Sequence, residues 1–141
     1  MTGNTYDNDN IFAKILRGEM PCFKVYEDDE TLAFMDIMPR SPGHCLVIPK
    51  EACRNMLDAS SLALTATHAS VQKISRAAMQ AFEADGITIQ QFNEPAAGQE
   101  VYHYHVHIIP RKEGVKMGPP GNMGDMDAIK ILGEKLAAAL T

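Results

Sequence analysis

The sequence predicts an α+β domain with a largely antiparallel, five-stranded sheet and one long helix. Three observations support this class. The chain of 141 residues has the length of one domain and is 45% hydrophobic, which is enough to bury a core. Its apolar residues follow a helical period in three segments and an extended pattern in five. Consecutive strand segments lie close together in the chain, which favours hairpins and antiparallel pairing.

The first half of the chain is expected to hold a short helix and three strands. Residues 1–10 are polar and acidic, and we expect a flexible lead. Apolar residues at positions 11, 12, 15 and 16 predict a helix over residues 11–18, ending at Gly18. Turn-forming residues separate the strands that follow. These strands are expected over residues 23–26, 31–36 and 45–48.

The second half is expected to hold the long helix, two strands and a closing helix. The long helix is predicted over residues 60–83, because five apolar residues form one stripe along it. The stripe consists of Leu64, Val71, Ile74, Ala78 and Phe82. Strands are expected over residues 87–92 and 101–109, with a loop at 93–99 between them. Residues 11–111 would form the main domain, and residues 112–141 a loop and a helix packed on it.

Composition excludes several classes of protein. No run of 18 apolar residues exists, so no membrane span is expected, and the first ten residues lack the pattern of a signal peptide. Three cysteines without Cys-x-x-Cys spacing argue against a disulfide framework and favour the cytoplasm. The formal net charge of −5 argues against a nucleic-acid partner. An anionic small substrate would need a local concentration of positive charge.

Histidines carry the clearest chemical signal. Three of the five lie within one short segment, at His103, His105 and His107. The residues between them favour a strand, which would place the three imidazoles together on one face, lining a surface or a cleft. A solvated polar face is one interpretation, although Thr, Lys or Glu would serve better there.

A metal site is a second interpretation, because clustered histidines often bind metals. On a strand, alternate residues lie about 6.6 Å apart, so the outer two Cα atoms would be roughly 13 Å apart. Zinc binds histidine nitrogens at about 2.1 Å, so it could take two neighbouring rings but scarcely three.

Phosphate chemistry is the third interpretation, and the one we favour. A neutral imidazole is a competent nucleophile toward phosphorus, and neighbouring imidazoles can donate hydrogen bonds to phosphate oxygens. The sequence has no G-x-x-x-x-G-K-[ST] or G-x-G-x-x-G loop that would grip phosphate instead. No cofactor is required, because imidazole itself supplies the nucleophile.

The segment Gly98-Gln99-Glu100-Val101-Tyr102-His103-Tyr104-His105-Val106-His107 resembles the signature of the histidine triad superfamily of nucleotide hydrolases and transferases. Upstream blocks around Ile11, Gly18, Ala33 and Pro42 resemble the family's N-terminal blocks in order and spacing. The resemblance covers about residues 11–111. It implies the fold of that family, a homodimer whose sheets join across the two-fold axis, and a nucleotide substrate with a leaning toward purines.

The resemblance also implies a role for each matching residue. His105 would be the nucleophile that carries the nucleoside monophosphate, His107 would contact the α-phosphate, and His103 would support the ring geometry. Gln99 would lie near the scissile bond. The residues implied for substrate binding are His44 beside the triad, Asn93 at the phosphate and ribose, Asp36 at the ribose hydroxyls, and Phe12, Ile15, Phe34 and Ile37 around the base.

Two departures from the family pattern bear on metal and substrate. Many bacterial relatives hold a structural zinc with Cys-x-x-Cys in the first block, where this chain has Asn10 and Ala13, so we expect no metal. Glu100 stands where many relatives have Ser or Thr. The segment before His103 resembles the phosphoramidase branch, and residues 109–111 resemble the dinucleoside polyphosphate hydrolases. Hydrolysis of a nucleoside phosphoramidate, hydrolysis of a dinucleoside polyphosphate, and nucleotide binding with little turnover all stay open.

Overall fold

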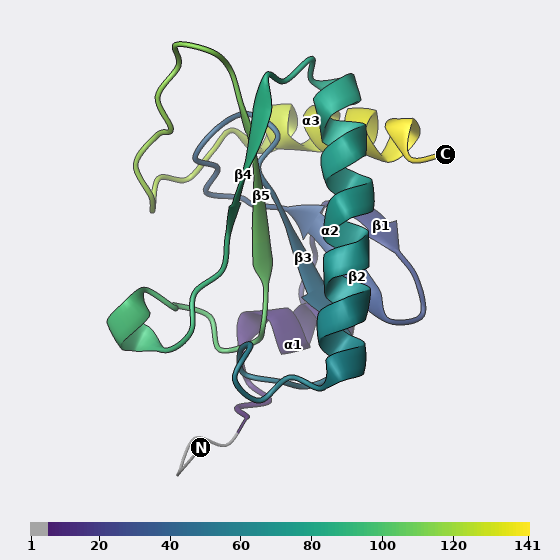
Figure 1. The fold of residues 1–141 in the computed structure, drawn as a ribbon, viewed down its shortest axis with the longest axis vertical. Helices are drawn as coiled ribbons and strands as arrows, with labels where there is room; N and C mark the ends of the chain where they lie inside the picture. Colours follow the sequence, from purple (N-terminus) through teal and green to yellow (C-terminus); the bar gives the residue numbers. More distant parts are fainter. Residues whose placement is uncertain (1–5) are drawn as a thin grey trace.

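The computed structural model describes residues 6–141, and over that range the chain forms one five-stranded antiparallel sheet in the order β1-β2-β3-β5-β4 (Figure 1). The predicted α+β class is confirmed. The strands are β1 (Lys24–Glu27), β2 (Thr31–Met35), β3 (Cys45–Pro49), β4 (Gly86–Gln90) and β5 (Val106–Arg111). The helices are α1 (Ile11–Leu16), α2 (Ser61–Ala81), the short 3-10 helix η1 (Pro95–Ala97) and α3 (Met126–Ala139).

The last strand differs from the prediction of residues 101–109, because β5 begins only at Val106. The preceding segment is bonded to the loop that follows β3, since the amide of Tyr104 donates to the carbonyl of Cys53 at 2.9 Å. Pro49, which ends β3, has no N–H to continue a ladder there. At the other end β5 passes through Pro110, where we expected it to stop. Pairing with β3 ends at Ile108, so no donor is needed from Pro110 on that side.

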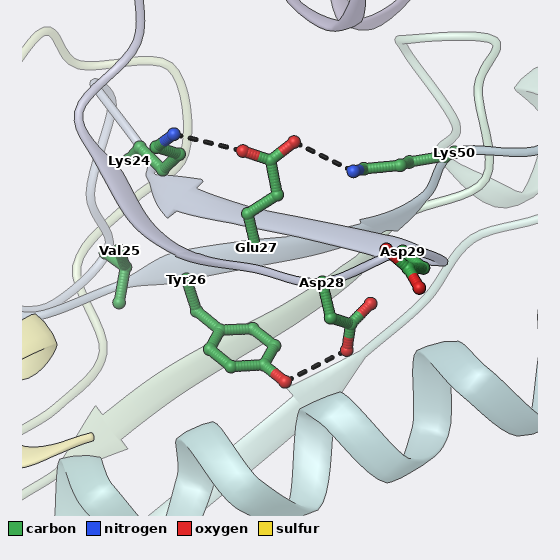
Figure 2. Close-up of a pocket in the computed structure, with 7 residues that line it drawn as sticks. All are labelled: Lys24, Val25, Tyr26, Glu27, Asp28, Asp29 and Lys50. Atoms are coloured by element: carbon green, nitrogen blue, oxygen red, sulfur yellow. Dashed lines mark hydrogen bonds and ion pairs between the residues drawn. The ribbon is translucent and has the colours of Figure 1, made fainter. Parts of the chain in front are cut away.

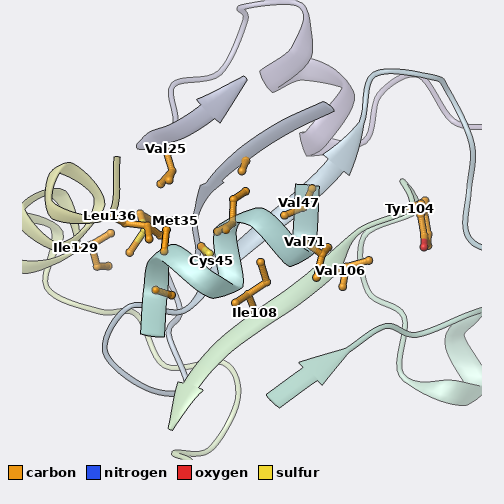
Figure 3. Packing of buried hydrophobic residues seen from close by; sticks show 14 of the residues in the cluster. Val25, Met35, Cys45, Val47, Val71, Tyr104, Val106, Ile108, Ile129 and Leu136 are labelled. Carbon is orange, nitrogen blue, oxygen red and sulfur yellow. The ribbon is translucent and has the colours of Figure 1, made fainter. Parts of the chain in front are cut away.

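The main core lies between the sheet and the helices α2 and α3 (Figure 3). Helix α2 begins at the N-cap Ser60, whose hydroxyl accepts from the amide of Ala63. The expected apolar stripe of α2 is confirmed, because all five of its residues belong to this core or pack against it. In Figure 1, α2 runs along the strands, and α3, near the C-terminus, crosses behind it.

Helix α1 covers the opposite face of the sheet. Alternate residues of β2 and β3 point to the two faces, as the pleat requires. Those on the second face form a smaller cluster with Phe12 of α1: Leu32, Phe34, Leu46 and Ile48. His107 pairs directly with Leu46, so it projects on this same face. The candidate site therefore lies on the side of the sheet that carries α1.

The lead predicted over residues 1–10 lies partly outside the described residues, which begin at Tyr6. Within the described chain, no helix is both long and apolar enough to cross a membrane. All three cysteines (Cys22, Cys45 and Cys53) have free thiols.

Candidate active site

The three histidines of the triad do not share one face of a strand, as the sequence had predicted. Only His107 lies on β5, while His103 and His105 belong to the irregular segment before it. The imidazoles are also more buried than expected. His103 is fully buried, His105 is 8% exposed, and the side chain of His107 is 17% exposed. Phe12 and Phe92 contribute to this cover through edge contacts with His105 and His107 respectively. Only a small part of the triad is therefore accessible to solvent.

His103 has both ring nitrogens bonded inside the protein. Its Nε2–H donates to the carbonyl of Pro49 at 2.8 Å, and its Nδ1 lies 2.5 Å from the hydroxyl of Tyr6. A carbonyl can only accept, so the proton is on Nε2 and Tyr6 is the donor to Nδ1. Burial lowers the pKa of His103 to about 4, so the ring is neutral at pH 7. His103 is a structural member of the triad.

His105 is placed to act as a nucleophile. Its Nδ1–H donates to the backbone carbonyl of His103 at 2.6 Å. In the neutral ring this leaves Nε2 with a lone pair, and no described residue hydrogen-bonds to that atom. Burial lowers the pKa of His105, which keeps the lone pair available at neutral pH. The rings of Phe12 and His107 hold it edge-on, with centroid distances of 4.9 and 5.1 Å.

A chain of hydrogen bonds sets the proton position on His107. The backbone N–H of Arg40 donates to Nδ1 of His44 at 3.0 Å, so the His44 proton lies on Nε2. That Nε2 is 2.9 Å from Nδ1 of His107, which must therefore accept. The remaining proton of His107 lies on its own Nε2. The N–H of His107 therefore belongs to the ring next to the nucleophile, since the centroids of the His105 and His107 rings are 5.1 Å apart.

Gly43 allows His44 to reach this position. The glycine has φ +92°, and a Cβ at this position would lie 2.6 Å from the ring of Phe82. The carboxylate of Asp36 lies beside the bond between His44 and His107, with Oδ2 at 3.4 Å from Nε2 of His44 and 3.8 Å from Nδ1 of His107. Burial lowers the pKa of both histidines, to about 3 for His107, where the nearby imidazoles act in the same direction. The pair is neutral at pH 7.

The four apolar residues implied for the base are only partly brought together. Phe12 and Phe34 meet edge to face at a centroid distance of 5.4 Å, and Ile15 packs against the same cluster. Ile37 is 39% exposed and lies outside that cluster. Asp36, next to it, accepts from the amide of Met38 at 2.7 Å.

The loop before the triad is tied by polar contacts that include Gln99 and Asn93. The buried amide of Gln99 accepts from the amide N–H of Glu94 and from Asn55, and it donates to the carbonyls of Arg54 and Val101. Asn93 exchanges hydrogen bonds with Gln91 and accepts from the amide of Met56 at 2.9 Å. Both side chains therefore hold the loop in this structure.

Sequence reasoning missed the residues that support this loop. Arg54 binds the carboxylate of Glu94 through two nitrogens, at 2.8 and 3.0 Å, and lies over the ring of Tyr102. The fully buried Asn55 donates to both Glu94 and Gln99. Arg54 and Glu94 are 40 residues apart in the chain, and no motif spacing links them. Tyr6 was missed as well, because it falls in the predicted lead.

Two groups of residues can be compared as metal sites: the first block of the chain, at Asn10 and Ala13, and the cluster of Asp36, His44 and His107. The zinc of bacterial relatives does not fit here, because the side-chain oxygen of Asn10 accepts from the amide of Ala13 at 2.9 Å and caps α1, and Ala13 has no ligand atom. Asp36, His44 and His107 offer three potential ligand atoms within 4.8 Å of one another. A cation there would have to displace the proton that joins the two imidazoles.

A surface hollow lies at the hairpin of β1 and β2, lined by seven residues (Figure 2). Glu27 stands between Lys24 and Lys50, with ion pairs of 3.0 and 2.8 Å. The hollow contains none of the residues implied for nucleotide chemistry. We call it the hairpin hollow; it consists of Lys24, Val25, Tyr26, Glu27, Asp28, Asp29 and Lys50.

The chain is similar to several known proteins in sequence and in fold. The family model of the HIT domain matches residues 17–114. The chain is 43% identical to the adenylylsulfatase HINT3 of Arabidopsis thaliana over 78% of its own length and 56% of that protein, so it spans a little over half of this relative. It is 36% identical to the adenosine 5′-monophosphoramidase hnt1 of Schizosaccharomyces pombe, covering 92% of this chain and 97% of that one. The crystal structure of a Hit-like protein from Bartonella henselae superimposes with a TM-score of 0.93 at 52% identity, covering 97% of this chain and all of that one.

Proposed function

The chain belongs to the HIT domain family, and from that membership we propose that it hydrolyses nucleoside 5′-phosphate derivatives at the α-phosphorus through a nucleotidyl intermediate on His105. Relatives named as an adenylylsulfatase and a monophosphoramidase support hydrolysis of a nucleotide derivative. The leaving group that we propose is an amine, as in a nucleoside phosphoramidate.

One observation carries the proposal. The hydrogen bonds around the triad leave one nitrogen unbonded among the described residues in each of two neighbouring rings: Nε2 of His105, with a lone pair, and Nε2 of His107, with an N–H. The first can attack phosphorus, and the second can donate to a non-bridging oxygen as negative charge grows there. A solvated polar face would not need both rings held neutral and oriented by buried bonds.

The reaction proceeds in two displacements. The lone pair of His105 Nε2 forms a bond to the α-phosphorus while the bond to the leaving group breaks, and the leaving group takes the bonding electron pair. A water then attacks phosphorus, and the P–N bond breaks to restore the lone pair. Over both steps one water is consumed. Its oxygen and one proton remain on the nucleoside monophosphate, and its other proton goes to the leaving group.

Binding of the nucleotide would use the residues around the triad. We propose that Asp36 binds the ribose hydroxyls, that Gln99 and Asn93 face the phosphates once the substrate is bound, and that His44 acts through His107. Phe12, Ile15, Phe34 and Ile37 would surround a purine base. The contact of Phe12 with His105 supports this placement, because it joins the apolar cluster to the nucleophile.

We also propose a homodimer that forms along β4. The sheet has two edges, and β1 carries Lys24 and Glu27, which discourage pairing with another strand. Strand β4 has no charged residue and leaves Ile89 exposed beside a hollow that it shares with α2. Antiparallel pairing of two β4 strands would join the sheets. The free thiols support the expectation of a cytoplasmic protein.

Trapping the intermediate tests the function. The protein is mixed briefly with adenosine phosphoramidate labelled at phosphorus, quenched in alkali and digested. We expect the label on the peptide that contains His105. Tight binding of adenosine monophosphate with neither label nor product would instead identify a nucleotide-binding module.

The alternative substrate class, a dinucleoside polyphosphate, rests on the sequence at residues 109–111. Rates for adenosine phosphoramidate and a diadenosine polyphosphate are compared on the same preparation. A higher kcat/KM for the polyphosphate would replace the amine leaving group in the proposal. The step at His105 would be unchanged.

A further inference from the structure

The N-terminal segment contacts two of the three triad histidines. Tyr6 bonds to His103, and Phe12 meets His105 edge-on at 4.9 Å. Tyr6 is half-buried, and its ring also meets the His103 ring edge-on, with a centroid distance of 5.5 Å. The segment between Tyr6 and α1 lies well upstream of the triad in the chain, so these are long-range contacts.

Short bonds hold this segment on α1. The buried Asn10 donates from its side chain to the carbonyl of Asp7 at 2.7 Å and caps the helix through its oxygen. Arg17, just after the helix, donates to the carbonyl of Asn8 at 2.8 Å. Tyr6 thus extends from an anchored turn.

We propose that Tyr6 is a positioning residue for catalysis. It fixes the ring of His103, and the backbone carbonyl of His103 in turn fixes the orientation of His105. The path has two bonds. The Tyr6 hydroxyl donates to Nδ1 of His103, which requires the proton of that ring on Nε2, where the carbonyl of Pro49 accepts it. The carbonyl of the same residue accepts Nδ1–H of His105, and this bond leaves the lone pair of the nucleophile on Nε2.

The chemistry of Tyr6 suits a fixed donor. Burial raises the pKa of its hydroxyl, so the proton stays in place across the working range. Without that hydroxyl, Nδ1 of a fully buried ring has no donor, and the other tautomer of His103 becomes competitive. That tautomer would present a lone pair to the carbonyl of Pro49, so the ring would turn. The carbonyl that orients His105 would move with it.

The test removes the hydroxyl alone. Tyr6→Phe keeps the ring. Tyr26→Phe is the matched control, since the Tyr26 hydroxyl donates to Asp28 in the hairpin hollow and accepts from Lys73 of α2, away from the triad. With adenosine phosphoramidate, we expect kcat of Tyr6→Phe to fall about five- to tenfold and KM to stay within about twofold. Tyr26→Phe should match the wild type. Both variants are assayed below their measured melting temperatures.

A spectroscopic readout separates positioning from general loosening. Long-range ¹H–¹⁵N correlation spectra identify which nitrogen of each histidine carries the proton. The wild type and Tyr26→Phe should show His103 protonated at Nε2 and His105 at Nδ1. Tyr6→Phe should show a second tautomer at one or both.

Two results would overturn the proposal: unchanged kcat, or a fall in kcat with unchanged tautomers of both rings. The proposal rests on the proposed function for its kinetic readout. If the wild type hydrolyses no nucleotide derivative, the proposed function fails, and the spectra alone decide whether Tyr6 sets the tautomers.

Discussion

The triad and the hairpin hollow are both clusters of titratable side chains on the same sheet. The carboxylates and lysines of the hairpin hollow are charged, whereas the imidazoles of the triad are neutral. At the hairpin hollow, Lys50 holds the pKa of the Glu27 carboxyl below its usual range, with Lys24 adding to the effect, so the group stays ionised (Figure 2). At the triad, burial lowers the pKa of the imidazoles, so the groups stay neutral. A lowered pKa therefore keeps the carboxylate of Glu27 charged, whereas the same direction of shift keeps the imidazoles uncharged.

This difference shows which of the two clusters keeps its side chains in a defined geometry. The ion pairs of the hairpin hollow join exposed, flexible side chains whose water contacts compete with the pairing. His103 and His105 bond to the backbone carbonyls of Pro49 and His103, and His107 bonds to His44, which is itself held by the amide of Arg40. Buried, directional bonds fix which nitrogen carries each proton, and catalysis by imidazole depends on that assignment.

The largest effect is expected from His105→Ala. Removing the attacking nitrogen should lower kcat for adenosine phosphoramidate by about a thousandfold or more, while adenosine monophosphate still binds within a few-fold of its wild-type affinity. Kinetics and calorimetry measure the two quantities. Tyr26→Phe, at the hairpin hollow, is the control and should behave as the wild type. A His105→Ala enzyme within tenfold of wild-type kcat would remove the nucleophile from the mechanism.

The next effect is expected from His44→Phe. Phenylalanine fills the space of the buried ring but cannot donate to Nδ1 of His107, so that ring is free to place its proton on the wrong nitrogen. We expect kcat to fall about ten- to a hundredfold with a smaller change in KM. The melting temperature of the variant shows whether it is folded at the assay temperature. Full activity in a folded variant would show that His107 does not need this donor.

The composition of the triad could be predicted from the sequence, whereas its geometry depends on long-range contacts. The spacing of His103, His105 and His107 predicted a strand with the three imidazoles on one face, but only His107 lies on β5. The apolar residues Val106 and Ile108 do face the core, as expected. The strand start was wrong, because Pro49 and the bond from Tyr104 to Cys53 redirect the chain. No local pattern encodes those partners.

The proton positions could not be predicted at all. They follow from the amide of Arg40, the carbonyl of Pro49 and the hydroxyl of Tyr6, none of which carries a motif of its own. His44 and Asp36 were chosen from the family resemblance, and their roles in binding remain predictions. The structure adds that both residues have a side-chain atom within 4 Å of Nδ1 of His107, a proximity that their spacing in the sequence would not give.

Lowering the pH should reduce the stability of the protein while changing its activity little. In the unfolded chain a histidine has a pKa of about 6.5, whereas the folded values for His103 and His107 are about 4 and 3. The unfolded state therefore binds more protons below pH 6.5, and the free energy of unfolding should fall as pH drops from 6.5 toward 4. For each buried histidine that stays neutral, the free energy of unfolding should fall by up to about 1.4 kcal/mol for every unit that the pH drops in that window.

Denaturant unfolding at pH 7 and pH 5 measures this loss, and kcat is followed in parallel. His103 and His107 stay neutral at pH 5 in the folded state, and burial lowers the pKa of His105 as well, so we expect kcat to change little while stability decreases. Equal stability at the two pH values would mean that the triad histidines are not buried as neutral rings.

The smallest effect is expected from Glu27→Gln, which removes the central charge of the hairpin hollow. Both partners of Glu27 are well exposed, so the loss of two surface ion pairs should change the free energy of unfolding by less than about 1 kcal/mol. Denaturant unfolding in low and high salt measures it, and high salt should remove most of the difference from the wild type, because salt screens exposed charges. The kinetic constants should not change. A large loss of stability that persists in high salt would show that the hairpin hollow, like the triad, depends on a fixed buried geometry, and the contrast between the two regions would fail.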